Sequence, residues 1–156
     1  TALRAFVSPT GGPGASTRLI RAAYDLEPRL VESDYESALN EVGVRQRKRA
    51  LVVLFTQVLD DTVAKTLLAG CRVLARQHLP LVVLFEDLDV AALLEPVSNA
   101  RGELYVRGAA AEILRWRRAL VRDLRHGGAH VLDVGPRELT GRLINHYLEI
   151  KARHWL

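Results

Sequence analysis

Three short stretches of the chain are mostly apolar and lack the alternation of a half-exposed strand. They cover residues 50–56, 79–87 and 129–135. Such runs are typical of strands buried on both faces of a parallel sheet. Pro80 lies at the start of the second run, where the loss of one amide donor is tolerated. The pattern therefore predicts three buried parallel strands.

Helical periodicity fills the intervals around these strands. A first helix, capped by Ser16 or Thr17, runs to about Tyr24. Further helices are predicted over residues 33–45, 61–77, 88–94, 103–125 and 137–153. The three main helices each have an apolar face that we expect to point inward. In helix 33–45 this face contains Tyr35, Ala38, Leu39 and Val42, and in helix 61–77 it contains Val63, Leu67, Leu68, Cys71 and Leu74. In helix 103–125 it contains Ala110, Ile113, Leu114, Leu120, Val121 and Leu124. Gly127 and Gly128 end the long helix, and Pro136 opens the last one.

Helices between successive strands act as crossovers and cover both faces of a parallel sheet. The predicted fold is therefore α/β, a Rossmann-like three-layer sandwich. This sheet is short of strands, because only residues 3–8 offer a fourth, short one. We expect a missing part of the fold upstream of Thr1, and the absence of methionine agrees with a fragment of a longer polypeptide. Strand 50–56 would then expose an apolar edge, which favours self-association.

Composition indicates one globular domain over residues 1–156, with 49% hydrophobic and 26% charged residues. No apolar run approaches the roughly 20 residues of a membrane span, and the first residues lack a long apolar segment, so we expect neither a membrane span nor a signal peptide in the chain as given. The single cysteine, Cys71, lies among leucines of a predicted helix. We interpret it as a small buried hydrophobe rather than a reactive thiol, in agreement with a reducing compartment.

The net charge of +4 comes almost entirely from arginine, concentrated in residues 45–49 and 115–125. A basic surface permits binding of nucleic acid or anionic lipid. Aromatic residues make up only 6% of the chain, which is few for stacking on single strands. The charges at positions 115, 117, 118, 122 and 125 flank the apolar stripe, as on a solvated helix face. We therefore expect no nucleic-acid partner.

Polar side chains gather where the predicted strands end. Gln57, Asp60 and Asp61 follow the first strand, Glu86, Asp87 and Asp89 follow the second, and Asp133 lies near the end of the third. Loops at the carboxyl ends of parallel strands are where ligands bind in such sheets. Asp60 and Asp61 also suit the start of a helix. One alternative is that Asp60, Glu86 and Asp133 serve a nucleotide binder or an enzyme.

Other candidate motifs have structural interpretations. Ser33 and Glu36 fit a capping box, although a cap hydroxyl can also face an ion. The glycine-rich residues 9–17 lack the Gly-Lys-Ser/Thr ending of a phosphate loop, so we interpret them as a loop only. The histidines, at positions 78, 126, 130, 146 and 154, have no metal-ligand spacing. No catalytic motif is present, so an enzyme is not expected.

Three stretches together resemble a known family. They are YDLEPRLVESDYESAL (24–39), RALVVLFTQVLDD (49–61) and LINHYLEIKAR (143–153). They are similar to the bacterial family called domain of unknown function 58, whose C-terminal part is a von Willebrand factor A-like domain. The resemblance implies a Rossmann-like sheet with a metal-ion-dependent adhesion site, often holding Mg²⁺, on its carboxyl rim.

The resemblance assigns three positions of this chain to that site. The hydroxyl of the second segment falls on Ser33, with Asp34 beside it, and the aspartate of the third segment falls on Gln57. The Asp-x-Ser-x-Ser motif of the first segment is absent, and Gln57 is a poor ligand for a hard cation. We therefore expect an incomplete or degenerate site, without a bound metal in this chain.

The resemblance also implies a function. We expect a non-enzymatic protein-interaction module that works with a MoxR-type AAA+ ATPase in the assembly of protein complexes. Family members often carry an N-terminal membrane anchor, so the expected location is the cytoplasm, at the inner face of the membrane. A Rossmann-like nucleotide binder or enzyme is the alternative, and a basic nucleic-acid-binding domain is the third hypothesis.

Overall fold

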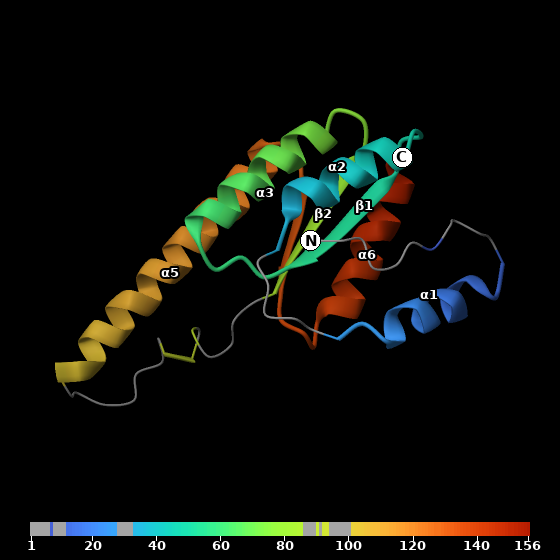
Figure 1. Ribbon diagram of the computed structural model, residues 1–156. Helices are drawn as coiled ribbons and strands as arrows, with labels where there is room; N and C mark the ends of the chain where they lie inside the picture. Colours follow the sequence, from blue (N-terminus) through green and yellow to red (C-terminus); the bar gives the residue numbers. More distant parts are fainter. Residues whose placement is uncertain (1–6, 8–11, 28–32, 86–89, 91, 94–100) are drawn as a thin grey trace.

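The computed structural model describes residue 7 and residues 12–27, 33–85, 90, 92–93 and 101–156, with side chains from residue 104 onward in the last range. The elements, in chain order, are α1 (Ala15–Tyr24), α2 (Tyr35–Arg45), β1 (Leu51–Thr56), α3 (Asp61–Leu74), β2 (Leu79–Phe85), α5 (Arg101–His126), β3 (His130–Val134) and α6 (Leu139–Ala152). Figure 1 shows how they follow one another. The predicted alternation of strands and helices is confirmed.

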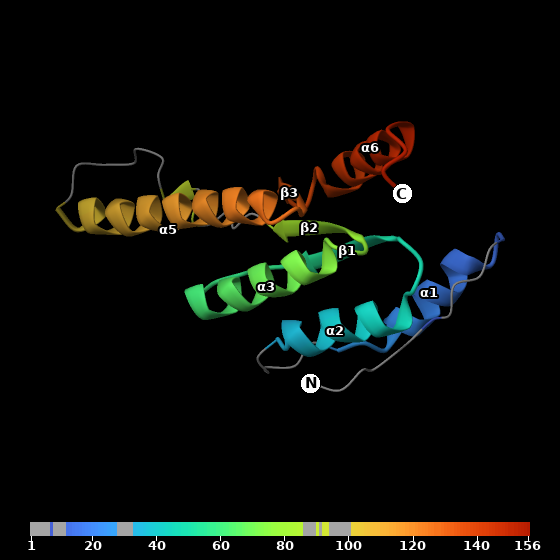
Figure 2. The ribbon, with the colours of Figure 1, turned by 90° about the horizontal axis from the view of Figure 1, so that it is seen from above.

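The three strands form one parallel sheet in the order β1-β2-β3. The central strand, β2, is buried from Leu79 to Leu84 because helices cover both of its faces. Helices α3 and α5 lie on one face and α6 lies on the other (Figure 2). This arrangement confirms the α/β, Rossmann-like fold class. It also brings the carboxyl ends of all three strands to one edge of the sheet, the carboxyl rim.

Each face of the sheet has its own hydrophobic core. The larger core joins α2, α3 and α5 to the sheet and contains Tyr35, Leu39, Val58, Ala64, Leu67, Cys71, Leu74, Val82, Leu84, Leu120, Val121, Leu124, Ala129 and Val131. The smaller core contains Leu81, Val83 and Val134, with Leu139 and Leu143 of α6 against it. Cys71 is buried, and burial raises the pKa of its thiol to about 11, as expected for a structural cysteine.

Burial differs from the prediction at several positions. Strand β1 is only partly buried, and Phe55 is 50% exposed, because β1 is an edge strand of the described sheet. The predicted exposed apolar edge is thus observed, whereas the prediction that this strand is completely buried was wrong. Ala38 and Ile113 are exposed rather than inward-facing.

Helix starts also differ from the prediction. Helix α1 begins at Ala15 and has no side-chain cap, so Ser16 and Thr17 lie within it. The N-cap of α2 is Asp34, whose Oδ1 accepts a hydrogen bond from the Ser37 amide at 2.9 Å. The prediction of a capping box formed by Ser33 and Glu36 was therefore wrong.

The start of α3 agrees with the prediction, and the start of α6 differs from it. The N-cap of α3 is Asp60, one of the two residues predicted to open this helix, and its Oδ1 accepts a hydrogen bond from the Val63 amide at 2.8 Å. Pro136 lies in a turn before α6 rather than in its first turn. Predictions on strand 3–8, apart from residue 7, on Glu86, Asp87 and Asp89, and on most of helix 88–94 lie outside the described residues.

A histidine pair fastens α6 and the last residues to the amino end of β3. His130 Nδ1 and His146 Nε2 share a hydrogen bond of 3.0 Å. The ring centroids of Trp155 and His130 lie 5.0 Å apart. The backbone carbonyl of Trp155 accepts a hydrogen bond from Arg49 Nε at 3.0 Å. Burial is the main cause that lowers the pKa of His130, and repulsion from His146 adds to it, while Glu149 opposes this shift.

This pair makes stability depend on pH. Because the folded-state pKa of His130 is lowered, the unfolded chain binds its proton more readily, and the free energy of unfolding falls as pH decreases through the ordinary value of about 6.5. We expect the melting temperature to decrease between about pH 7.5 and about pH 5.5, and to decrease less in His130→Gln. His126→Gln, at an exposed position, is the control. Equal decreases in all three proteins would contradict the assignment.

Candidate functional site

The start of α2 and the end of β1 meet at the carboxyl rim. The hydroxyl of Tyr35, the first residue of α2, is hydrogen-bonded to the hydroxyl of Thr56, the last residue of β1. Both side chains are buried. Ser33 and Asp34 directly precede Tyr35, and Gln57 directly follows Thr56. The fold thus brings the two segments that carry the predicted site residues to one place.

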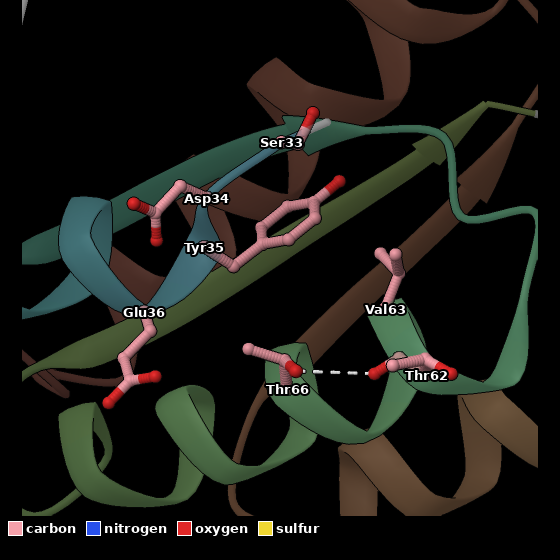
Figure 3. Close-up of a pocket in the computed structure, with 7 residues that line it drawn as sticks. All are labelled: Ser33, Asp34, Tyr35, Glu36, Thr62, Val63 and Thr66. Atoms are coloured by element: carbon pink, nitrogen blue, oxygen red, sulfur yellow. Dashed lines mark hydrogen bonds between the residues drawn. The ribbon is translucent and has the colours of Figure 1, made fainter. Parts of the chain in front are cut away.

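Two separate hollows open at this rim. The first, of about 280 Å³, is lined by Ser33, Asp34, Tyr35, Glu36, Thr62, Val63 and Thr66 (Figure 3). The second, of about 600 Å³, is lined by Gln57, Val58, Leu59, Asp60, Asp61, Val90, Ala109, Glu112, Ile113, Leu114, Trp116 and Arg117. Ser33 and Asp34 therefore line one hollow, and Gln57 lines the other.

The first hollow holds polar groups that already have local roles. The Asp34 carboxylate caps α2, and hydrogen bonds from the backbone and side chain of Ser37 lower its pKa. In Figure 3 the Ser33 hydroxyl points away from this carboxylate. Thr66 Oγ1 donates a hydrogen bond to the Thr62 carbonyl at 3.2 Å within α3. The hydroxyl and the carboxylate therefore do not converge on one point.

The residues of the rim do not fit a hard cation. Within the described part of the chain, no group of three or more His, Cys, Asp or Glu side chains is arranged to hold a metal. Mg²⁺ prefers near-octahedral oxygen ligands, usually including one or two carboxylates. Asp34 is used as a helix cap, and Gln57 supplies a neutral amide in another hollow. The arrangement offers polar contacts but not a cation cage.

Carboxylates at the neighbouring positions are also engaged. Asp60 caps α3, and Asp61 pairs with Lys65 at 2.6 Å, which lowers the pKa of Asp61. Asp133 Oδ1 accepts hydrogen bonds from Arg117 at 2.6 and 3.1 Å. Of the carboxylates proposed for a nucleotide site, Asp60 and Asp133 thus have structural partners, and Glu86 lies outside the described residues.

Arg117 is the rim residue that the sequence interpretation missed. Its guanidinium also donates to the Phe85 carbonyl at 2.8 Å, so it joins α5 to the ends of β2 and β3. Its side chain is only 11% exposed, which corrects the prediction that it lies on a solvated face. A signal was present, because Arg117, Val121 and Leu124 follow the i, i+4, i+7 spacing of one helix face.

The second hollow is mainly apolar beside its acidic edge. Val58, Leu114 and Trp116 form part of its wall, and Leu59 is exposed at its margin. An apolar hollow beside polar groups is the kind of surface that receives an anchoring side chain of a protein partner.

One titratable side chain away from the rim is also buried. His78 has no hydrogen-bond partner for either ring nitrogen among the described residues.

Comparison with known proteins identifies the family. A family model described as Protein of unknown function DUF58 matches residues 1–93, which is more than half of the chain. No curated protein and no solved structure gives a significant match. None of the described helices has the length and apolar composition to cross a membrane. The chain therefore belongs to the family described as Protein of unknown function DUF58.

Proposed function

We propose that this chain is a non-enzymatic protein-interaction module of von Willebrand A type, with the carboxyl rim as its binding surface. The observation that carries this proposal is the buried hydrogen bond between Tyr35 and Thr56. It holds the Ser33–Asp34 segment beside the Thr56–Gln57 segment, as the resemblance to such domains implies. The apolar hollow next to Gln57 adds a surface suited to a protein side chain.

The adhesion site of this module is degenerate and works without a metal. Gln57 contributes an amide where such sites use a carboxylate, which removes a negative charge that Mg²⁺ would require. Asp34 serves as the cap of α2. Binding at the rim then depends on hydrogen bonds and apolar contacts rather than on an ion that bridges to an acidic side chain of the partner.

The partner proposed for this rim is a MoxR-type AAA+ ATPase, on the basis of the family resemblance. The setting proposed with it is the cytoplasmic face of the inner membrane. The partly exposed edge of β1 supports a second, weaker contact, self-association between copies of the chain, because an apolar strand edge favours pairing with another strand.

The degenerate site is tested by adding the missing carboxylate. We expect Mg²⁺ or Mn²⁺ to leave the melting temperature of the unmodified chain unchanged relative to chelator, and to raise that of Gln57→Asp. The gain at a metal concentration equal to Kd is about 0.4 kcal/mol and grows with concentration.

Gln77→Asp is the matched control, because Gln77 is exposed and lies after α3, at the opposite end of the sheet. A metal-dependent rise in the unmodified chain would show that the rim already holds an ion. Equal rises in Gln57→Asp and Gln77→Asp would show that the added charge, and not its place at the rim, attracts the metal.

The partner is tested by direct binding to a purified MoxR-type AAA+ ATPase in the presence of chelator. We expect measurable binding, weakened at least about tenfold by Gln57→Arg, because a bulky charge would block the rim beside the apolar hollow. Gln77→Arg introduces the same side chain away from the rim and should bind like the unmodified chain. Absence of binding, or equal weakening by both variants, would reject this partner at this surface.

A further inference from the structure

The solvent face of α5 carries a line of arginines. Its members are Arg107, Arg115, Arg118, Arg122 and Arg125, all of them exposed. Positions 115, 118, 122 and 125 follow the i, i+3, i+7, i+10 spacing of one helix face. From Arg107 to Arg125 the line is about 27 Å long, at 1.5 Å per residue. We call it the arginine line; Arg117, which turns inward, does not belong to it.

The arginine line has few acidic neighbours. Arg122 pairs with the adjacent Asp123 at 3.2 Å. Among the described residues, the side chains of Arg107, Arg115 and Arg118 make no hydrogen bond or ion pair. Ordinary surfaces mix charges of both signs, and like charges spaced three or four residues apart destabilise a helix. An acidic surface placed along this face would remove that repulsion.

A hollow beside the carboxyl-terminal half of the line can receive anionic side chains. It measures about 330 Å³ and is lined by Arg118, Val121, Arg122, Arg125, His126 and Asp133. Asp133 is neutralised by its ion pair with Arg117. Arginine guanidinium groups bind carboxylates through two parallel hydrogen bonds, which gives geometric selectivity as well as attraction. The hollow therefore favours a partner that carries carboxylates.

The surroundings of the line decide between classes of anionic partner. At the amino-terminal end of α5, Leu104, Tyr105 and Val106 are exposed apolar side chains, which a nucleic-acid backbone would leave unused. An anionic membrane takes up the apolar face of a helix. In α5 that face is buried in the core through Ala110, Leu120 and Leu124. A protein surface with both acidic and apolar side chains matches the arginine line together with Leu104, which lies on the same helix face three residues before Arg107.

We propose that the arginine line docks an acidic amphipathic helix of a protein partner. The partner's carboxylates would face Arg115, Arg118, Arg122 and Arg125, and its apolar residues would contact Leu104 at the other end of the same helix face. Packed helices lie about 8–10 Å apart, which is within reach of paired Arg and Glu side chains. This inference rests on the proposed function only in that both concern protein binding. The hollow beside the arginine line and the hollow beside Gln57 share no lining residue.

The test measures binding of a synthetic helical peptide with Glu at i, i+3, i+7 and i+10 and leucines toward one end. A second peptide has the same composition with the order of residues scrambled. Arg118→Glu/Arg122→Glu is compared with Arg47→Glu/Arg137→Glu, at exposed positions off the line. Each double variant changes the formal net charge by −4, from +4 to 0. Circular dichroism checks that both remain folded.

We expect the patterned peptide to bind the unmodified chain more tightly than the scrambled one, with affinity falling as salt is added. Reversal of Arg118 and Arg122 should weaken binding at least about tenfold, and the control reversal far less. Gln57→Arg should leave peptide binding intact, which separates this surface from the rim.

Three outcomes would overturn the proposal. The two peptides would bind equally, or neither would bind, if the line had no organised docking geometry. The two double variants would lose affinity equally if only the net charge mattered. Tighter binding of phosphatidylserine vesicles or of duplex DNA, lost on reversal of Arg118 and Arg122, would assign the line to a membrane or to nucleic acid instead.

Discussion

Burial of β2 from Leu79 to Leu84 is the constraint on which the rest of the structure depends. Leu81, Val82, Val83 and Leu84 have no exposed surface, so both faces of this strand need a covering layer. Helices α3 and α5 supply one layer and α6 the other. Crossover connections of this kind make the strands parallel, which brings their carboxyl ends to one edge. The candidate site lies at that edge because the buried strand requires this topology.

The rim shows how structural roles limit the available chemistry. Asp34 and Asp60 cap helices, Asp61 pairs with Lys65, and Asp133 pairs with Arg117. Each carboxylate is stabilised by a local partner, so its charge is not directed toward a common ligand. What the rim offers instead is a pair of hollows, one polar and one apolar. This balance supports the proposal that the rim recognises a protein.

Sequence patterns predicted the strands, most helices and the Asp60 cap, because these depend on local periodicity and capping chemistry. The Asp34 cap was missed because Ser33 and Glu36 form an equally good local motif. Helix α2 begins one residue later than that motif predicts, and its first residue, Tyr35, makes the buried contact with Thr56. Exposure of Phe55 depends on which strands lie beside β1, and local pattern carries no such information. That the segment of Ser33 lies beside the segment of Gln57 was expected from the family resemblance rather than from spacing.

The most direct test of the account is a double-mutant cycle on the hydrogen bond that assembles the rim. Tyr35→Phe and Thr56→Val each remove one hydroxyl, and the free energy of unfolding is measured for both single variants and for the double variant. The account predicts a coupling energy of about 1 kcal/mol, as for a buried hydrogen bond. Additive effects, within about 0.3 kcal/mol, would contradict the claim that this contact holds α2 at the end of β1.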